Sequence, residues 1–232
     1  MNQTSELTTE QIQAEQSRFI TKVYAWMTFA LIITGAVSIW CASTPSMIEF
    51  IFGNSLIFWG LIIVEFICVA VLVSTVSRIS SNKATFIFIG YSALNGLTLS
   101  GIFLIYTSQS IASTFFVTAI TFGVMSTYGY FTKRDLTSVG NLATMALVGI
   151  FIASIVNIFL GSEMLYWVIT YVGVLIFVAL IARDTQKIKE LNIIGNEGTE
   201  EDKKEAIMGA LTLYLDFINL FLFLLRLLGR RK

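Results

Sequence analysis

Acidic side chains within apolar runs are the first candidates for chemistry in this sequence of 232 residues. Asp216 lies in the run LTLYLDFINLFLFLL, and Glu65 lies in GLIIVEFICVAV. A charged side chain at the centre of a bilayer costs roughly 2.5 to 3.5 kcal/mol even on the mildest scale. Each acid therefore indicates an ion or proton site. The alternative for each is a neutral carboxyl group that only makes a packing contact or one hydrogen bond between helices.

A polar stripe extends along the helix on both sides of Asp216. Spacings of 3, 4 and 3 residues place Gly209, Thr212, Asp216 and Asn219 within about 80° of one another on one helix face. Lipid offers no hydrogen-bond partner, so this face must point into the bundle or toward a water-filled cavity. Thr212 and Asn219 are therefore candidate residues of an ion pathway that includes Asp216.

Asp184 is the second acid of interest, because it closes the apolar run VALIARDTQK just before the span that contains Asp216. Two carboxylates about 4 Å apart repel by about 4 kcal/mol at an effective dielectric near 20, which is enough to keep one proton on the pair. Such a pair titrates as one unit. When ionised, it offers oxygen ligands to a hard cation such as Ca²⁺.

This aspartate pair requires the sixth helix to continue past Arg183, toward Lys189, with its basic side chains extended to the membrane surface. The alternative is that Asp184 is a surface residue, paired with Arg183 or with Lys187.

Composition excludes several classes of function. The chain has no His, which rules out imidazole metal sites and Ser-His hydrolysis. Cys41 and Cys68 both lie in apolar runs, and the 15 basic residues balance the 15 acidic ones, so nothing points to a disulfide framework or to nucleic acid. The last span has no Lys for a retinal Schiff base, and RDTQ and LYLDF lack the glycine-containing motif of aspartyl intramembrane proteases. We therefore expect neither an enzyme nor a bound cofactor.

The same composition predicts an all-α integral membrane protein. Hydrophobic residues make up 56% of the chain, charged residues only 13%, and the mean hydropathy is +0.79, whereas soluble domains carry about 25% charged residues. A hydrocarbon core about 30 Å thick needs roughly 20 apolar residues of helix. Seven runs meet this test: 19–42, 55–77, 84–106, 110–131, 139–160, 164–182 and 206–225. Pro45 marks a turn after the first run.

Three parts follow from these runs: a polar N-terminal arm (1–18), a seven-helix transmembrane domain (19–226) and a basic C-terminal tail (227–232). Lys and Arg occur in the N-terminal flank and in the second, fourth and sixth links, but not in the first, third or fifth. The N-terminus is therefore expected in the cytoplasm. The tail conflicts with this rule, so either the earlier helices dominate insertion or the last segment is re-entrant. We favour seven full spans, because the last run is long enough to cross.

Small residues four positions apart favour close contacts between membrane helices. Such sets are Gly96 with Ser100, Ala119 with Gly123 and Thr127, and Gly149 with Ala153. We expect them to line helix–helix interfaces.

Four segments resemble the transmembrane Bax inhibitor motif family, and most closely its bacterial inner-membrane branch. They are NGLTLSGIFLIY (95–106), STYGYFTKRDL (126–136), ARDTQKIK (182–189) and GALTLYLDFINLFLFLLR (209–226). The resemblance covers nearly the whole chain from Phe19 onward.

The resemblance implies a seven-helix bundle with the last helix at its centre, located in a bacterial inner membrane. It also implies a pH-sensitive calcium leak pathway, in which the aspartate pair falls on Asp184 and Asp216 and these carboxylates meet Ca²⁺ as the transported ion. Arg78 is the equivalent of an arginine that latches the closed state, although an ordinary positive-inside anchor is the alternative for it. Glu65 resembles an acidic residue of the ion pathway.

A second hypothesis also comes from the resemblance, since some bacterial members associate with a membrane-bound AAA protease and modulate it. The chain would then be a non-conducting regulator that acts through its N-terminal arm and the loop at 184–205. Animal relatives suppress cell death, a role that a bacterial chain without an apoptotic partner does not inherit. The lipid bilayer is the one partner that composition requires, and the sequence carries no signal for its oligomeric state.

Overall fold

The computed structural model describes residues 8–232, so the first seven residues of the predicted arm lie outside the described part. The rest of the arm forms the beginning of the first helix, α1 (Thr9–Ala42). Thr8 caps this helix, because its side chain accepts a hydrogen bond from the backbone N–H of Gln11 while the Gln11 side chain binds the Thr8 N–H.

The described chain is helical, with one isolated bridge between Tyr106 and Arg231. After α1 come α2 (Pro45–Phe52), α3 (Ser55–Thr75), α4 (Ser81–Leu99), α5 (Ile102–Ile105), α6 (Ser108–Phe131), α7 (Thr137–Leu160), α8 (Glu163–Leu191) and α9 (Glu200–Leu228). Seven spans within residues 8–232 are long and apolar enough to cross a membrane, with α4 and α5 forming one of them. The all-α, seven-span prediction is confirmed.

Two helices extend beyond the apolar runs that predict them. The sixth run ends near residue 182, whereas α8 continues to Leu191, so the extension past Arg183 that the aspartate pair required is confirmed. Likewise α9 begins at Glu200, several residues before its apolar run, with Thr199 as the N-cap and an acidic first turn that suits the positive end of the helix dipole. Hydropathy marks where a chain leaves the hydrocarbon, whereas hydrogen bonding and capping decide where a helix stops.

Two further segments differ in detail from the sequence-based prediction. Pro45 does more than mark a turn: it occupies the first position of the short helix α2, where its missing N–H costs nothing. The third span is interrupted at Ser100 and Gly101, where α4 ends and the single turn of α5 follows.

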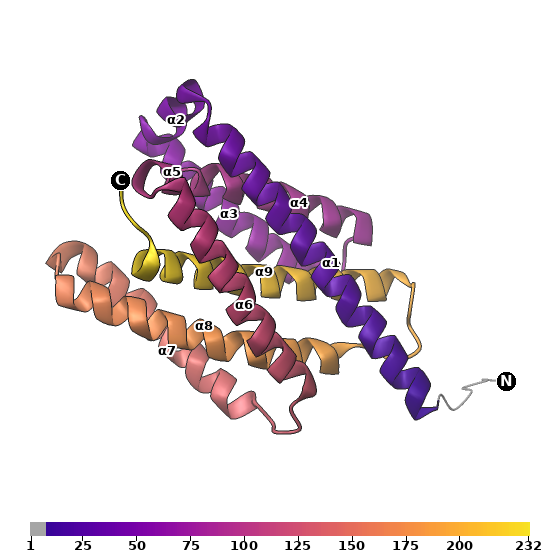
Figure 1. Ribbon diagram of the computed structural model, residues 1–232. Helices are drawn as coiled ribbons and strands as arrows, with labels where there is room; N and C mark the ends of the chain where they lie inside the picture. The colour runs from indigo at the N-terminus through magenta and orange to yellow at the C-terminus, as the bar shows by residue number, and fades with distance from the viewer. Residues whose placement is uncertain (1–7) are drawn as a thin grey trace.

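The connections sort to two ends of the bundle (Figure 1). The start of α1 and the α3–α4, α6–α7 and α8–α9 connections lie at one end, called here the basic end because these segments hold the Lys and Arg of the links. Helices α2 and α5, the α7–α8 connection and the C-terminus lie at the other. Helix α9 runs the full length between the two ends and does not re-enter.

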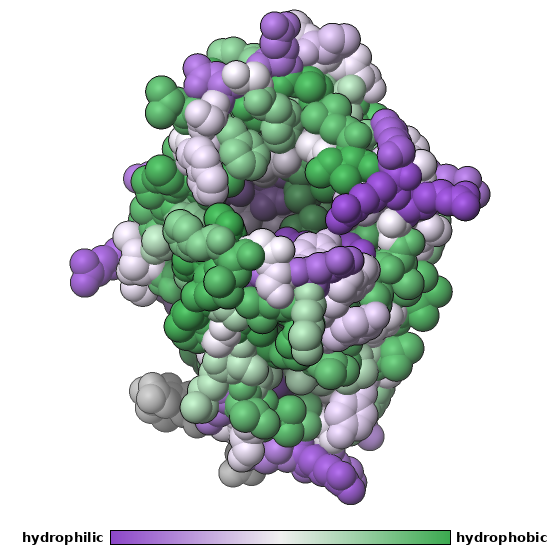
Figure 2. All heavy atoms as spheres, turned by 90° about the vertical axis from the view of Figure 1, so that its left-hand side faces the viewer, coloured by the Kyte–Doolittle hydropathy of each residue, from purple (hydrophilic) through white to green (hydrophobic). Residues whose placement is uncertain are grey.

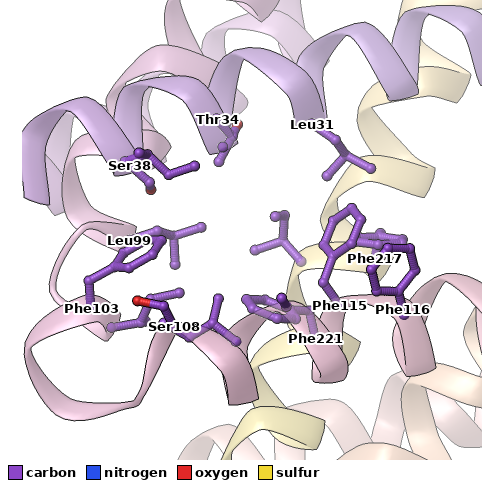
Figure 3. A pocket seen from close by; sticks show the side chains of 16 residues that line it. Leu31, Thr34, Ser38, Leu99, Phe103, Ser108, Phe115, Phe116, Phe217 and Phe221 are labelled. Carbon is purple, nitrogen blue, oxygen red and sulfur yellow. The ribbon is translucent and has the colours of Figure 1, made fainter.

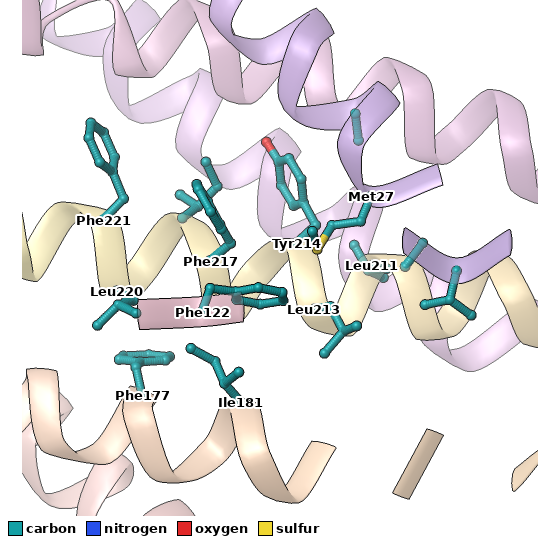
Figure 4. Close-up of a cluster of buried hydrophobic side chains, with 14 of the residues drawn as sticks. Met27, Phe122, Phe177, Ile181, Leu211, Leu213, Tyr214, Phe217, Leu220 and Phe221 are labelled. Carbon is teal, nitrogen blue, oxygen red and sulfur yellow. The ribbon is translucent and has the colours of Figure 1, made fainter. Parts of the chain in front are cut away.

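Helix α9 is the most buried span. In its most apolar window 67% of residues are buried, against 6% for α3 and 11% for α7. It packs against α1, α4, α6 and α8, while α3 packs mainly on α4 and α7 on α8. Figure 4 shows its side chains at the centre of the buried cluster, with Leu220 near Phe177 of α8. The ring centroids of Phe217 and of Phe122 on α6 are 5.6 Å apart.

The outer surface of the bundle is apolar. Green apolar side chains cover most of the face in Figure 2, and hydrophilic residues gather in a few separate places. Leu56 and Phe159 are 82% and 84% exposed. Such exposure suits contact with lipid tails.

Tyr214 shows how α9 satisfies a polar group inside the bundle. Its side chain is fully buried, and its hydroxyl lies 2.7 Å from Oγ1 of Thr34 on α1. The Phe88 and Tyr91 rings of α4 pack edge-to-face against the Tyr214 ring, with interplanar angles of 88° and 75°. This contact fixes α9 against both α1 and α4.

The predicted close contacts are present at Gly96 and absent at Gly123 and Gly149, although Ala119 of the α6 set does pack against the core. A Cβ at Gly96 would lie 2.8 Å from the Thr34 carbonyl oxygen, so α4 and α1 do approach closely there. Gly123 and Gly149 are exposed, with nothing within 4 Å of a Cβ. In α6 the buried row instead contains Ser126 and Gly129, since fourfold spacing occurs on more than one face of that helix.

Gly129 provides a test of this packing. Its missing Cβ would overlap the backbone carbonyl of Ala182, whose carbon lies 2.8 Å away and has no side-chain freedom with which to yield. We expect Gly129→Ala to destabilise the protein by about 1–3 kcal/mol through forced separation of α6 from α8. Thermal unfolding of the purified protein in detergent measures this change. Gly123→Ala on the same helix is the matched control and should leave the melting temperature unchanged. Equal effects of the two variants would contradict the assigned interface.

Candidate functional site

The two carboxyl groups singled out by the sequence lie side by side. Asp184 on α8 and Asp216 on α9 are 7% and 6% exposed, and their carboxyl groups are close enough to interact electrostatically. Within residues 8–232, Oδ2 of Asp216 is buried and has no hydrogen-bond donor. Ionised carboxylates only accept hydrogen bonds. Two of them in contact therefore need either a shared proton or a cation between them.

Asp184 reaches this position because α8 continues past it to Leu191. The alternative of an exposed surface residue was wrong, although the pairing with Arg183 that it included is present: Nη1 of Arg183 donates to Oδ1 of Asp184. The Arg183 side chain crosses α7 at Gly140, where any Cβ would overlap its aliphatic carbons. Gly140 thus leaves the space that holds this guanidinium beside the pair.

A cavity of about 760 Å³ leads from the basic end to Asp184. It lies mainly between α8, α9 and the loop that joins them. Charged residues from both helices line it: Arg183, Asp184, Lys187, Glu190, Glu201, Lys204 and Glu205. Thr212 lies on its wall, whereas Asp216 does not line it. Asp184 is therefore the member of the pair that this cavity reaches.

The predicted polar stripe of α9 divides into residues with different environments. Gly209 allows close approach to Ile188 of α8 and Val23 of α1. Thr212 lines the cavity, and its hydroxyl donates to the Met208 carbonyl of its own helix at 3.1 Å. Asn219 is half-buried, and its Nδ2 donates to the carbonyl of Leu215 on its own helix.

Glu65 and Arg78 are not brought to the aspartate pair. Glu65 is half-buried on α3, and Oε1 accepts a hydrogen bond of 2.7 Å from the Thr98 hydroxyl of α4. Arg78 is exposed in the turn that follows α3, and it forms no ion pair with the described residues. The neighbouring Ser77 lines the cavity. In this structure the guanidinium beside Asp184 is that of Arg183, not Arg78.

A buried hydroxyl chain beside Asp184 escaped the sequence analysis. Thr185 is fully buried, and its Oγ1 lies 2.8 Å from Oγ of Ser126 on α6, which in turn bonds to the Tyr24 hydroxyl of α1. These three residues tie together the helices that surround the pair. Ser126 could have been noticed in the sequence because it begins the motif STYGYFTKRDL. Hydropathy, however, does not distinguish a hydroxyl that faces α8 from one that faces lipid.

Another cavity, of about 350 Å³, is apolar and unsuited to ions. It lies between α1, α6 and α9, and Figure 3 shows Leu31, Phe115, Phe217 and Phe221 among the side chains that surround it. The hydroxyl of Thr34 on its wall already donates to the Ser92 carbonyl of α4. This cavity is therefore not part of the polar site around Asp184.

The start of α1 holds the loop over the larger cavity through what we call the loop clasp. Its contacts are Glu15 Oε1 with the Gly195 N–H (2.8 Å), Arg18 with Glu197 (2.8 Å) and Lys22 with Asp202 (2.6 Å). The hydrogen bond from Arg18 holds the pKa of the Glu197 carboxyl below its ordinary value. That ion pair therefore persists to a lower pH than a free glutamate would allow, and is lost as the pH falls through the lowered value.

The two ion pairs of the loop clasp should differ in strength. Asp202 is almost fully buried, so Lys22→Gln leaves its carboxylate with the Gly198 N–H as its remaining partner in the loop, at an expected cost of about 1–3 kcal/mol. Arg18→Gln removes the same charge from an exposed pair and should cost less than about 1 kcal/mol. Chemical unfolding of both variants in detergent compares them. A larger loss for Arg18→Gln would contradict the clasp.

The chain matches a family model over residues 16–232. That family is described as "Inhibitor of apoptosis-promoting Bax1". The match includes every described helix except the first turns of α1.

Curated relatives agree with this family over nearly their full length. The inner membrane protein YbhL of Escherichia coli (strain K12) is 49% identical over 223 residues, which cover 96% of this chain and 95% of that protein. An uncharacterized protein of Borreliella burgdorferi is 43% identical over 217 residues, covering 94% of each chain. Uncharacterized protein RP147 of Rickettsia prowazekii is 43% identical over 220 residues, covering 93% of this chain and 90% of its own. With seven apolar helices and this match, the chain belongs to the Bax inhibitor-type family of multi-pass membrane proteins.

Proposed function

We propose that this protein is a pH-sensitive leak pathway for Ca²⁺ in the bacterial inner membrane, gated by Asp184 and Asp216, with the N-terminus in the cytoplasm. One observation carries the proposal: two buried carboxyl groups lie close together on consecutive helices, and one of them, Asp184, lines a cavity of about 760 Å³. The membrane is the one named for YbhL, and the orientation rests on the basic residues gathered at one end.

The carboxyl pair supports gating through its charge. With one shared proton, the two side chains are joined and α8 is held against α9. Loss of that proton creates a second negative charge, and at about 4 Å the two charges repel by roughly 4 kcal/mol in a medium of effective dielectric 20. A divalent cation relieves that repulsion. Protonation removes the attraction, so entry of Ca²⁺ weakens as the pH falls through the titration of the pair.

The pair supplies four carboxylate oxygens at most, whereas Ca²⁺ takes six to eight oxygen ligands. A passing ion would therefore keep part of its water shell, which suits transit more than storage. The Thr212 hydroxyl on the cavity wall would contact that shell, and Asn219 and Glu65 are the proposed polar residues farther along the pathway. Ca²⁺ is here the cargo, so no bound cofactor is proposed.

Arg78 remains the proposed latch of a closed state. Its neighbour Ser77 lines the cavity, and the connection that holds Arg78 leads into α4, whose first residue, Ser81, donates its N–H to Glu200 at the start of α9. In that role it would pair with an ionised aspartate, and opening would have to break the ion pair.

Asp216→Asn tests the gate, since an amide cannot be ionised or share the proton in the same way. We expect Ca²⁺ flux into proteoliposomes to lose its dependence on pH. If the pair contributes even about 1.4 kcal/mol to cation entry, the flux also falls about tenfold.

Asp135→Asn is the matched control, because Asp135 is exposed in the α6–α7 connection. That variant should keep the wild-type pH profile. The same profile in Asp216→Asn would refute the gate. Parallel measurements with H⁺ and Na⁺ identify the ion.

One observation favours the second candidate, a non-conducting regulator of a membrane-bound AAA protease. The loop clasp joins the start of α1 to the α8–α9 loop, so the two segments on which that function depends form one surface. Co-purification of a protease that survives Asp216→Asn but fails after deletion of residues 2–8 would support it. Absence of flux in the wild type would favour it further.

A further inference from the structure

A polar pocket lies at the end of the bundle opposite the loop clasp. It encloses about 550 Å³ between the α7–α8 connection and the last residues of the chain. Its walls include Asn157, Glu163, Tyr166, Trp167, Arg226 and Arg231. Neither the aspartate pair nor the larger cavity shares these residues, so the pocket needs an explanation of its own.

Two guanidinium groups in this pocket have no carboxylate partner. Arg226 lies over the rings of Phe223 and Tyr166, at 5.4 and 6.0 Å from their centroids. Nη2 of Arg231 donates to the Tyr166 hydroxyl at 3.4 Å. Within residues 8–232 neither arginine forms an ion pair, although Glu163 lines the same pocket. A guanidinium presents a planar set of donors that suits the oxygens of a phosphate.

The backbone that carries Arg231 is held in place. The N–H of Thr107 donates to the Arg230 carbonyl at 3.0 Å, and the N–H of Lys232 donates to the Ile105 carbonyl at 2.9 Å. These bonds fasten the tail to the connection between α5 and α6. The positive charge is therefore ordered before any ligand arrives, which lowers the entropy cost of binding.

The surroundings of the pocket are those of a lipid headgroup. Trp167 and Tyr166 are the residue types that concentrate where hydrocarbon meets water. The chain on either side of the α7–α8 connection is strongly exposed and apolar, with Phe159 84% and Met164 80% exposed. A ligand that fills the pocket thus meets polar groups inside it and an apolar surface beside it.

The charge pattern points the same way. The links at this end of the bundle contain no Lys or Arg, so its positive charge comes from Arg226 in the last turn of α9 and from the tail residues Arg230, Arg231 and Lys232. We propose that the pocket binds the headgroup of an anionic phospholipid, with its phosphate between Arg226 and Arg231 and its acyl chains along α7 and α8. The proposal is independent of the gate at Asp184 and Asp216.

The test uses the full-length protein in nanodiscs made from equal amounts of phosphatidylglycerol and phosphatidylcholine. Native mass spectrometry of the released complex measures the ratio of the two lipids that stay bound, which should favour phosphatidylglycerol. The double variant Arg226→Gln/Arg231→Gln should reduce that preference by about tenfold or more, because it removes the two guanidinium groups that would make charge-assisted hydrogen bonds to the phosphate. Glu163→Gln should increase it, because a competing negative charge is removed.

Arg230→Gln is the matched control, because it removes the same charge one residue away from a side chain that lines the pocket. It should keep the preference, and an equal loss in this control would show attraction to the tail as a whole and overturn the site. Equal retention of both lipids by the wild type would overturn it too. Displacement of the lipid by glycerol phosphate or inorganic phosphate would identify a site for free anions instead.

A second measurement uses only the wild-type protein, so it does not depend on whether a variant folds. Short-chain phosphatidylglycerol should raise the melting temperature of the wild-type protein in detergent more than the same concentration of short-chain phosphatidylcholine does, because a ligand that binds only the folded state stabilises it. Equal shifts with the two lipids would contradict the proposal.

Discussion

The middle of a bilayer contains no water to solvate a carboxylate, and this constraint governs how the bundle is built around Asp216. A helix with such a residue cannot face lipid, so α9 is covered by α1, α4, α6 and α8 and is the most buried span. Asp184 meets Asp216 from α8, and Arg183 stands beside it. The position of the last helix thus follows from where one acidic side chain can be tolerated.

The composition of the other helices depends on how far they lie from the aspartate pair. Helices α3 and α7 are nearly all apolar and largely exposed, because they contact lipid on most of their surface. Helices α6 and α8 carry hydroxyls and glycines where they approach the pair, at Ser126, Gly129 and Thr185. Short side chains at these positions allow close backbone contact and give buried hydroxyls partners on the neighbouring helix.

The charged residues at the two ends of the bundle have different surroundings. At the basic end, the loop clasp covers a cavity that reaches Asp184, and the charged residues there are partly paired. At the opposite end, the tail is fastened by backbone hydrogen bonds, while Arg226 and Arg231 form no ion pair with any residue of 8–232. Basic residues usually concentrate in the links at the cytoplasmic end of a membrane protein. Unpaired arginines at the opposite end therefore distinguish this tail from an ordinary membrane anchor.

The sequence by itself determined the seven spans, the end at which the basic links gather and the need to bury Asp216, because hydropathy and the cost of charge in lipid are local properties of the chain. It also left Asp184 open between a buried pair and a surface residue. Only the tertiary structure decided that choice, since the end of α8 depends on hydrogen bonds and on neighbours such as Gly140. For the same reason, only the tertiary structure could show that Gly129, not Gly123, faces another helix, and that Arg183 rather than Arg78 lies beside the pair. Residue spacing defines the faces of a helix. Packing decides which neighbour each face contacts.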